Sequence, residues 1–211
     1  MSLDHLARSH PSAALSADLV GRFTAAGIAI IEYALSKADL AHLDALFPRV
    51  PQRTVGARTS DITSATETWL TDHDGLNQLA ARLGTGGMHL SHVAASAQPH
   101  DMHWFVPWHQ DRAGHKADRS QSQLERVIAL HIHLDDCEDD NGPLEVIPGS
   151  HLSGRLDTAA MRALVATSSP LLCLAVRGDI VAVRPLLVHR SQRARLPSPR
   201  RTLHLEYEPN S

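Results

Sequence analysis

From Met88 onward the chain consists mostly of short alternating apolar runs separated by turn residues, and this pattern constrains the fold more than any other feature. Such spacing is typical of a β-sandwich or barrel. One helix is expected to interrupt the strands at about 157–167, begun by Asp157. The sequence therefore predicts a mainly β fold with flanking helices, in which residues of about 88–208 form a double-sheet jelly roll, or double-stranded β-helix.

The preceding part of the chain, about residues 1–87, is predicted to be largely helical. Helices are expected at 16–26 and after the capping box that residues 36–39 resemble, and a third is marked by apolar positions within 76–83. Residues 48–68 look like an irregular connection that is long for a compact domain. We expect residues 1–211 to form a single domain.

Composition excludes several classes of protein. The chain has 211 residues, 43% of them hydrophobic, and a formal net charge of −3, which fits an ordinary globular domain and gives no electrostatic footprint for nucleic acid. Its two cysteines, Cys137 and Cys173, do not suggest a disulfide framework. We see no signal peptide and no apolar run long enough to span a membrane. A cytoplasmic protein is the expectation, with no nucleic-acid or membrane partner and an oligomeric state that the sequence leaves open.

A histidine and an aspartate two residues apart are the main functional signal. In a β-strand, side chains at i and i+2 point to the same face, so His109 and Asp111 can bind one ion while Gln110 points away. His189 follows about 80 residues later, at the end of an apolar run over 181–188 that reads as a strand. Two imidazoles and one carboxylate can occupy one face of an octahedral metal, as in non-heme Fe(II) oxygenases.

Two adjacent arginines lie about one strand and turn beyond His189. The guanidinium of Arg200 or Arg201 could bind a carboxylate through two parallel hydrogen bonds, as a dicarboxylate cosubstrate would require. A strand-like run follows them at 202–207. The alternative is that both are surface charges.

Six short segments then occur in an order that resembles the phytanoyl-CoA dioxygenase family of Fe(II)- and 2-oxoglutarate-dependent oxygenases. The segments are 104–111, 131–136, 141–144, 147–151, 184–191 and 200–201. The resemblance covers roughly residues 88–208. It implies Fe(II) and 2-oxoglutarate as cofactors, O2 as a reactant and a small-molecule substrate.

Carried over position by position, the resemblance makes His109, Asp111 and His189 the iron ligands. Arg200, eleven residues after His189, matches the arginine that binds 2-oxoglutarate, and Arg201 is the alternative if the strand register differs by one.

Further positions are implied at the cosubstrate. Ser191 matches a small polar residue after the last ligand, and His133 occupies a matching position on a predicted strand. Gln98 stands where close relatives often carry a lysine, so the second anchor of 2-oxoglutarate differs here.

Other residues near these motifs are candidates for substrate contact or for support of the ligands. His131 shares a strand face with His133, and Trp104 and Trp108 flank the His-x-Asp motif. Each could instead serve packing alone. The acidic residues at 135–140 are interpreted as a solvated turn.

The intact Asp111 favours hydroxylation of an unactivated C–H over halogenation, because halogenases of this superfamily carry a small residue there. Desaturation, epoxidation and ring formation remain open. Two other classes are also open: a zinc hydrolase using the same three residues, and a non-catalytic jelly-roll binding protein. Polar segments 53–68 and 112–123 are expected to act as lids over the site.

Overall fold

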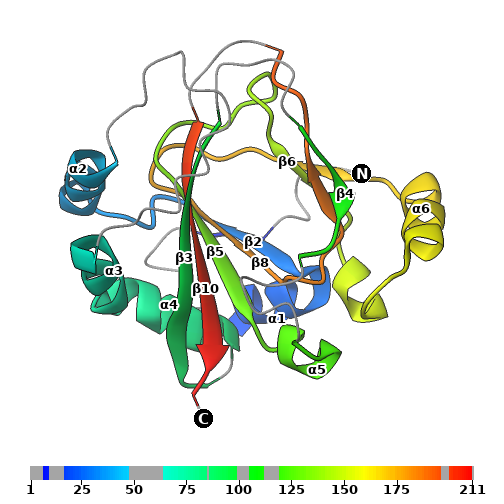
Figure 1. Ribbon diagram of the computed structural model, residues 1–211, viewed down its shortest axis with the longest axis horizontal. Helices are drawn as coiled ribbons and strands as arrows, with labels where there is room; N and C mark the ends of the chain where they lie inside the picture. The colour runs from blue at the N-terminus through cyan, green and yellow to red at the C-terminus, as the bar shows by residue number, and fades with distance from the viewer. Residues whose placement is uncertain are drawn as a thin grey trace.

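Two β-sheets facing one another form the centre of the molecule (Figure 1). The computed structural model describes residues 7–9, 17–47, 64–84, 86–98, 105–111, 119–195 and 200–210. The large sheet has the strand order β1 (Ala7–Ser9), β2 (Ile28–Ile31), β8 (Ile180–Val183), β5 (Ile128–His133), β10 (Arg200–Pro209) and β3 (Met88–Gln98). The small sheet has the order β4 (Val106–His109), β9 (His189–Ser191), β6 (Leu144–Val146) and β7 (Leu171–Cys173). Neighbouring strands are antiparallel except β1 and β2, which run parallel.

Side chains that alternate along the strands fill the space between the sheets. Ile28 and Ile30 of β2 meet Val181 and Val183 of β8 in this core. Val146, Leu171 and Cys173 contribute from the small sheet. Because successive strand residues point to opposite faces, the intervening residues of the large sheet must be buried on its other side.

Helices cover that outer face of the large sheet (Figure 1). They are α1 (Ala17–Ala26), α2 (Lys37–Leu46), α3 (Ser64–Thr71) and α4 (Asp74–Gly84). Apolar residues of all four pack against the outward side chains of β5 and β10. This arrangement confirms the predicted β-rich core with flanking helices and the predicted jelly roll.

Local signals in the sequence explain where several helices begin and end. Ser36 and Asp39 form the predicted capping box at the start of α2. Asp157 caps α6 (Thr158–Thr167) by accepting a hydrogen bond from the Ala160 N–H. Gly27 ends α1 with a positive φ of 76°, and a Cβ there would overlap the His151 imidazole. A side chain larger than hydrogen is therefore excluded at position 27 on two grounds.

The prediction was wrong in two places. Residues 64–68, interpreted as part of an irregular connection, belong to α3, while the rest of that connection lies outside the described residues. The run over 181–188 is not one strand: β8 ends at Val183, and β9 of the other sheet begins at His189. Pro185 has no N–H to continue the ladder, and the Leu187 N–H bonds the Arg184 carbonyl at 2.9 Å, which makes a turn.

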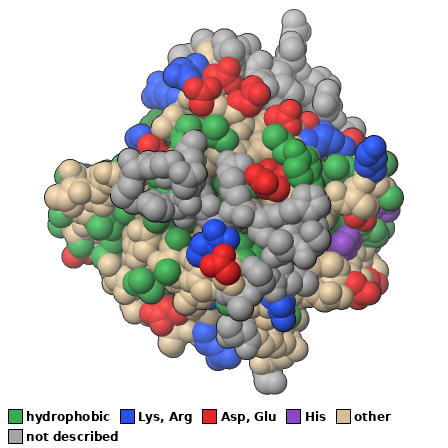
Figure 2. Space-filling model, turned by 180° about the vertical axis from the view of Figure 1, so that it is seen from behind, with side chains coloured by type: hydrophobic (Ala, Val, Ile, Leu, Met, Phe, Trp, Pro, Cys, Tyr) green, Lys and Arg blue, Asp and Glu red, His purple; other side chains and the backbone are tan. Residues whose placement is uncertain are grey.

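Two short helical segments and the surface complete the description. α5 (Gln121–Leu124) and the 3-10 helix η2 (Ser150–Ser153) connect strands. Basic and acidic side chains are interspersed on the face shown in Figure 2. Within the described ranges, no helix is both long and apolar enough to cross a membrane.

Candidate active site

The small sheet brings the two candidate histidine ligands side by side. His109 of β4 and His189 of β9 are direct cross-strand partners, and their ring centroids are 4.1 Å apart. Asp111 lies just beyond the end of β4, where its backbone N–H bonds the Pro185 carbonyl at 2.8 Å. The chain turn after β8 therefore positions both the aspartate and the strand that carries His189.

The three side chains converge at one point. The Nε2 of His109 lies 3.5 Å from Oδ1 of Asp111, and the Nε2 of His189 lies 3.8 Å from the same oxygen. One ligand atom from each residue lies within 4.8 Å of the others. Such an arrangement of two imidazole nitrogens and a carboxylate could hold one metal ion.

Hydrogen bonds on the far side of each ring prepare both histidines for a metal. The Nδ1 of His109 is 2.8 Å from the Pro107 carbonyl, and the Nδ1 of His189 is 2.8 Å from the Leu187 carbonyl. A carbonyl only accepts, so Nδ1 carries the proton, and Nε2 of the neutral ring keeps a free lone pair. Metal-binding histidines commonly donate their other N–H in this way. The residues present therefore fit a divalent ion.

The electrostatics of the three residues agree with that fit. Burial would raise the pKa of the Asp111 carboxyl, but charge on His189 and the hydrogen bond from His109 hold it well below its usual range. Burial lowers the pKa of His189. Although burial disfavours its charged form, the hydrogen bond to Asp111 raises the pKa of His109. A bound cation would take the place of the proton that Nε2 of His109 must carry to hydrogen-bond Asp111, and it would satisfy the ionised carboxylate between the two imidazoles.

A second group of polar side chains lies on the inner face of the large sheet. Thr202 of β10 pairs with His133 of β5, and Arg200 precedes Thr202 by two residues, so these side chains share a face. Arg200 Nη2 donates to the Ser191 hydroxyl at 3.3 Å, which itself donates to the Gly142 carbonyl at 2.9 Å. Arg200 thus reaches across to β9, two residues beyond His189.

His133 has an unusual environment for a buried imidazole. Its side chain is buried, and its Nδ1 has no hydrogen-bond partner among the described residues. Burial, followed by the positive charge of Arg200, lowers the pKa of His133 to about 3. An unsatisfied buried nitrogen is costly, so a ligand that supplies the missing partner beside Arg200 would relieve that cost.

Comparison with known proteins matches these residues to one family. The model of the phytanoyl-CoA dioxygenase family matches residues 10–202, which includes the candidate metal ligands and Arg200. The chain belongs to the phytanoyl-CoA dioxygenase family. That membership confirms the relationship expected from the six sequence segments.

One curated relative matches part of the chain. L-proline trans-4-hydroxylase from Streptomyces griseoviridis is 44% identical over 54 residues, which are 26% of this chain and 20% of the relative. The match therefore spans about a fifth of that relative's length.

Solved structures share the fold over nearly the whole chain. AviO1 from Streptomyces viridochromogenes is 26% identical, with a TM-score of 0.70 over 91% of this chain and 94% of its own. EctD from S. alaskensis is 20% identical, with a TM-score of 0.75 over 93% of this chain and 78% of its own; it has also been solved with bound Fe and with 2-oxoglutarate and 5-hydroxyectoine. The α-ketoglutarate-dependent epimerase SnoN is 20% identical, with a TM-score of 0.74 over 94% and 84%.

Arg201, the register alternative to Arg200, lies on the opposite face of the large sheet. Its backbone N–H and its Nε and Nη2 all donate to the Asp135 carboxylate at 2.8–3.0 Å. Its Nη1 donates to the Phe47 carbonyl at 2.5 Å. These contacts hold Arg201 away from the metal candidates and against the helical layer. They also correct the interpretation of Asp135 as solvated, because its side chain is only 7% exposed.

Other predicted site residues fall in different places. His131 lies on the inner face of the large sheet, with its ring centroid 4.1 Å from that of His204. Trp108 lies beneath the Arg190 guanidinium, 4.9 Å from it; Arg190 alternates with the inward-facing residues of β9, so this contact belongs to the outer face of the small sheet. The backbone of Gln98 pairs with Arg200, but its side chain, like Trp104, lies outside the described residues.

Sequence reasoning missed two contacts. His204 stacks on His131, and its place four residues after Arg200 on one strand could have indicated that it shares the inner face. Cys137 lies 3.6 Å from Arg200 Nη1, and no sequence signal pointed to that contact.

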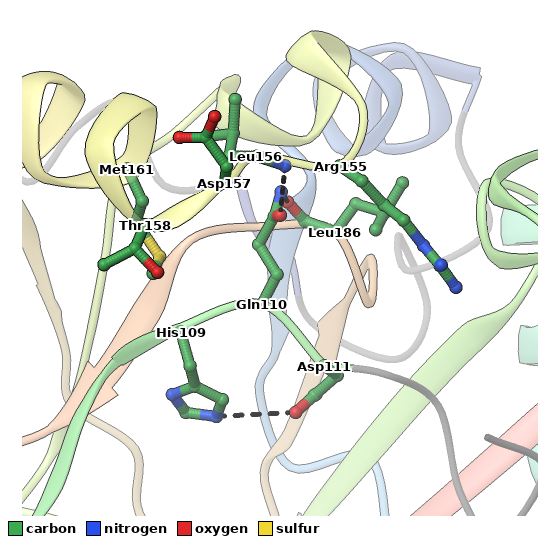
Figure 3. Close-up of a pocket in the computed structure, with 9 residues that line it drawn as sticks. All are labelled: His109, Gln110, Asp111, Arg155, Leu156, Asp157, Thr158, Met161 and Leu186. Atoms are coloured by element: carbon green, nitrogen blue, oxygen red, sulfur yellow. Dashed lines mark hydrogen bonds and ion pairs between the residues drawn. The ribbon is translucent and has the colours of Figure 1, made fainter.

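Gln110 points away from the metal candidates, as predicted, and holds the neighbouring chain. Its Nε2 donates to the Gly154 carbonyl at 2.8 Å and to the Leu186 carbonyl at 2.7 Å. Its Oε1 accepts from the Leu156 N–H at 2.9 Å (Figure 3). The segment before α6 is thereby fixed to the strand that carries His109, and the two together border a pocket of about 410 Å³.

Proposed function

We propose that this chain is a non-heme Fe(II)- and 2-oxoglutarate-dependent dioxygenase that hydroxylates an unactivated C–H of a small metabolite. The observation that carries the proposal is the convergence of two imidazole Nε2 atoms and one carboxylate, with both Nδ1 protons held by backbone carbonyls. Family membership and the fold shared with oxygenases support it. When bound, the iron and 2-oxoglutarate supply the oxidising power to break a C–H bond with O2.

The roles proposed for the chain follow from its contacts. His109, Asp111 and His189 would hold the iron. Arg200 would bind the far carboxylate of 2-oxoglutarate, which a guanidinium can grip with two hydrogen bonds. Ser191 already accepts from Arg200 Nη2 and would keep that side chain aimed across the cavity.

His133 would complete the cosubstrate pocket. In the neutral form that its low pKa favours, the ring offers one donor and one acceptor, and its unpartnered Nδ1 lies beside Arg200. Hydrogen bonding to a carboxylate of 2-oxoglutarate requires the tautomer in which Nδ1 carries the proton. His133 and Ser191 are buried, and burial strengthens polar contacts of this kind.

A small substrate is favoured over an acyl-CoA thioester. The partial match to L-proline trans-4-hydroxylase supports a free metabolite. Residues 1–211 are proposed to act as one oxygenase domain. The cytoplasmic location stays a prediction.

The test is anaerobic reconstitution with Fe(II), followed by addition of 2-oxoglutarate and O2. Succinate should form only when all three are present, and 2-oxoglutarate binding measured by equilibrium dialysis should depend on Arg200. A zinc hydrolase would instead be active with Zn²⁺ and without O2 or 2-oxoglutarate. A non-catalytic binding protein would form no succinate under any of these conditions.

A further inference from the structure

The guanidinium of Arg200 is contacted by a different side chain at each of its two terminal nitrogens. Its Nη2 donates to the Ser191 hydroxyl at 3.3 Å, and its Nη1 donates to the Cys137 sulfur at 3.6 Å. Ser191 belongs to β9 of the small sheet, whereas Cys137 lies beyond the end of β5 of the large sheet. Two separate parts of the fold therefore hold the guanidinium, one at each end.

The two acceptors are built in the same way. The Ser191 hydroxyl donates its own proton to the Gly142 carbonyl at 2.9 Å. The Cys137 thiol donates to the Cys173 carbonyl, with 3.9 Å between the sulfur and the oxygen. A hydroxyl or thiol whose proton is bonded to a carbonyl can offer only a lone pair to its other neighbour. Both side chains therefore act toward Arg200 as acceptors, and the thiol is the weaker of the two.

The position of Cys137 is fixed by its surroundings. Its N–H donates to the Ala175 carbonyl at 2.7 Å, and its carbonyl accepts from the Ala175 N–H at 3.1 Å, which forms an isolated β-bridge. The side chain is buried and belongs to the apolar cluster that includes Val146 and Leu171. Because close packing leaves this sulfur little freedom to move, the orientation of Arg200 depends on the position of the sulfur.

The thiol can orient Arg200 without neutralising its charge. Burial raises the pKa of the Cys137 thiol, although the positive charge of Arg200 acts in the opposite direction. The sulfur therefore stays protonated at neutral pH. An anionic side chain at this position would instead form an ion pair with Arg200. Such a pair would compete with any carboxylate that binds from the cavity.

His133 independently indicates that a ligand binds in this part of the cavity. Its Nδ1 is buried and has no hydrogen-bond partner among the described residues, and the charge of Arg200 acts on its ring. Each terminal nitrogen of a guanidinium carries two N–H groups. One contact at each end, to Cys137 and to Ser191, is therefore compatible with two parallel hydrogen bonds to a carboxylate.

We propose that Cys137 is a positioning residue for 2-oxoglutarate, because it orients the Arg200 guanidinium toward the far carboxylate of the cosubstrate. This inference rests on the proposed function and adds a residue to its cosubstrate site. In this role Cys137 acts through Arg200 and does not touch the cosubstrate. Replacing Cys137 should therefore affect only those ligands that have a carboxylate for Arg200 to bind.

The test compares the affinities of two ligands for Fe(II)-loaded protein by equilibrium dialysis without O2. 2-Oxoglutarate has the far carboxylate, and 2-oxopentanoate has the same carbon chain ending in a methyl group. We expect Cys137→Ala to weaken binding of 2-oxoglutarate by about three- to tenfold, the usual effect of losing one neutral hydrogen bond, and to leave binding of 2-oxopentanoate unchanged. Cys137→Ser keeps a neutral acceptor and should retain most of the affinity for 2-oxoglutarate.

A charged replacement gives a larger effect. Cys137→Asp places a carboxylate against Arg200, so binding of 2-oxoglutarate should weaken by on the order of a hundredfold. Binding of 2-oxopentanoate should again change little. If the buried carboxylate prevents folding, the comparison of Cys137→Ala with Cys137→Ser decides the proposal without this variant.

Cys173→Ala is the matched control, because Cys173 is a buried cysteine of the same apolar cluster. It should lower the melting temperature about as much as Cys137→Ala does and leave the affinity for 2-oxoglutarate unchanged. The proposal is overturned if Cys137→Ala binds 2-oxoglutarate like this control, if it weakens both ligands equally, or if Cys137→Ser binds as weakly as Cys137→Ala. Failure of the unaltered protein to bind 2-oxoglutarate would instead refute the proposed function.

Discussion

The two faces of the large sheet bury different kinds of side chain. On the outer face, apolar residues of β5 and β10 pack against four helices, and the buried Arg201 is bonded to Asp135 and to backbone carbonyls. On the inner face lie Arg200 and three histidines of the same two strands. The same two strands therefore carry, on one face, an arginine bonded to groups of the protein and, on the other, the buried His133 Nδ1 without a partner among the described residues.

This difference separates residues that maintain the fold from residues that serve a ligand. A buried polar group whose partners all lie within the protein supports the fold. Removing the group therefore lowers the free energy of unfolding. A buried polar group without a partner, such as His133 Nδ1, lowers stability unless something binds. We therefore expect substitutions on the outer face to change the free energy of unfolding, and those at the inner cavity to change binding and turnover.

The largest effect is expected at the metal candidates that face the inner cavity. Asp111→Ala removes the carboxylate that both imidazoles approach, so bound iron should fall sharply and O2-dependent turnover should drop to background. Iron analysis and succinate assay check this. Asp139→Ala, at an exposed ion pair with Arg195, is the matched control and should change neither. Near-normal iron binding by Asp111→Ala, or by His189→Ala, would mean that the ligand set is wrong.

The outer face should respond in stability alone. Arg201→Met leaves the buried Asp135 without its main partner, which typically costs about 3–5 kcal/mol, and the melting temperature should fall by on the order of 10 °C. Adding Asp135→Leu should restore much of the loss, because no uncompensated charge then remains. Calorimetry measures both, and the KM for 2-oxoglutarate should stay the same in every variant that folds. If Arg201→Met raised the KM for 2-oxoglutarate and left the melting temperature unchanged, Arg201 rather than Arg200 would be the residue that binds the cosubstrate.

The inner arginine should show the reverse pattern. Arg200→Lys replaces a guanidinium, which can donate two parallel hydrogen bonds to a carboxylate, with an ammonium group that acts as a point charge. The KM for 2-oxoglutarate should therefore rise by about ten- to a hundredfold. The free energy of unfolding should change by less than about 1 kcal/mol, since the Ser191 hydroxyl and the Cys137 sulfur that Arg200 contacts are both neutral acceptors. Steady-state kinetics and urea unfolding on the same preparation test both halves of this statement.

The last prediction concerns pH. The pKa of His133 is lowered to about 3 in the folded chain, against roughly 6.5 when unfolded. Above pH 6.5 both states are neutral and His133 does not affect stability. As the pH falls below about 6.5, the unfolded chain takes up the proton and the folded chain does not, so about 1.4 kcal/mol is lost per pH unit. The loss continues down to about pH 3.

A matched variant isolates this contribution. His133→Gln cannot titrate, so its unfolding free energy should fall less steeply between pH 6.5 and 5 than that of the unaltered protein. Equal slopes would show that His133 is not buried in its neutral form. Saturating 2-oxoglutarate should also raise the melting temperature of the unaltered protein more than that of His133→Gln.

Local patterns predicted much of the fold and the metal candidates. The capping residues Ser36 and Asp157 act within one turn of helix. His109 and Asp111 are two residues apart at the end of one strand. Both patterns are local, so the sequence alone predicts them. The cross-strand meeting of His109 with His189 required only that the fold bring two strands together.

What the sequence could not reveal depends on distant contacts. Asp135 lies in an acidic run, so its sequence context indicates a solvated side chain. In the structure it is buried against Arg201, which lies 66 residues further along the chain, and this contact could not be read from local sequence. The split of the run over 181–188 depends on which sheet each half joins, and apolar composition is the same on either side. The choice between Arg200 and Arg201 is a choice of register, which one residue reverses.

The three hydrogen bonds of Gln110 have a consequence for redesign of the enzyme. They tie Gly154, Leu156 and Leu186 to a residue directly between two metal candidates. Exchanging the stretch that leads into α6 for one of another length would move those backbone groups, and the shift would be passed to His109 and Asp111. Changes of side chains at 155–161 that keep the length of the loop should therefore leave the positions of His109 and Asp111 intact.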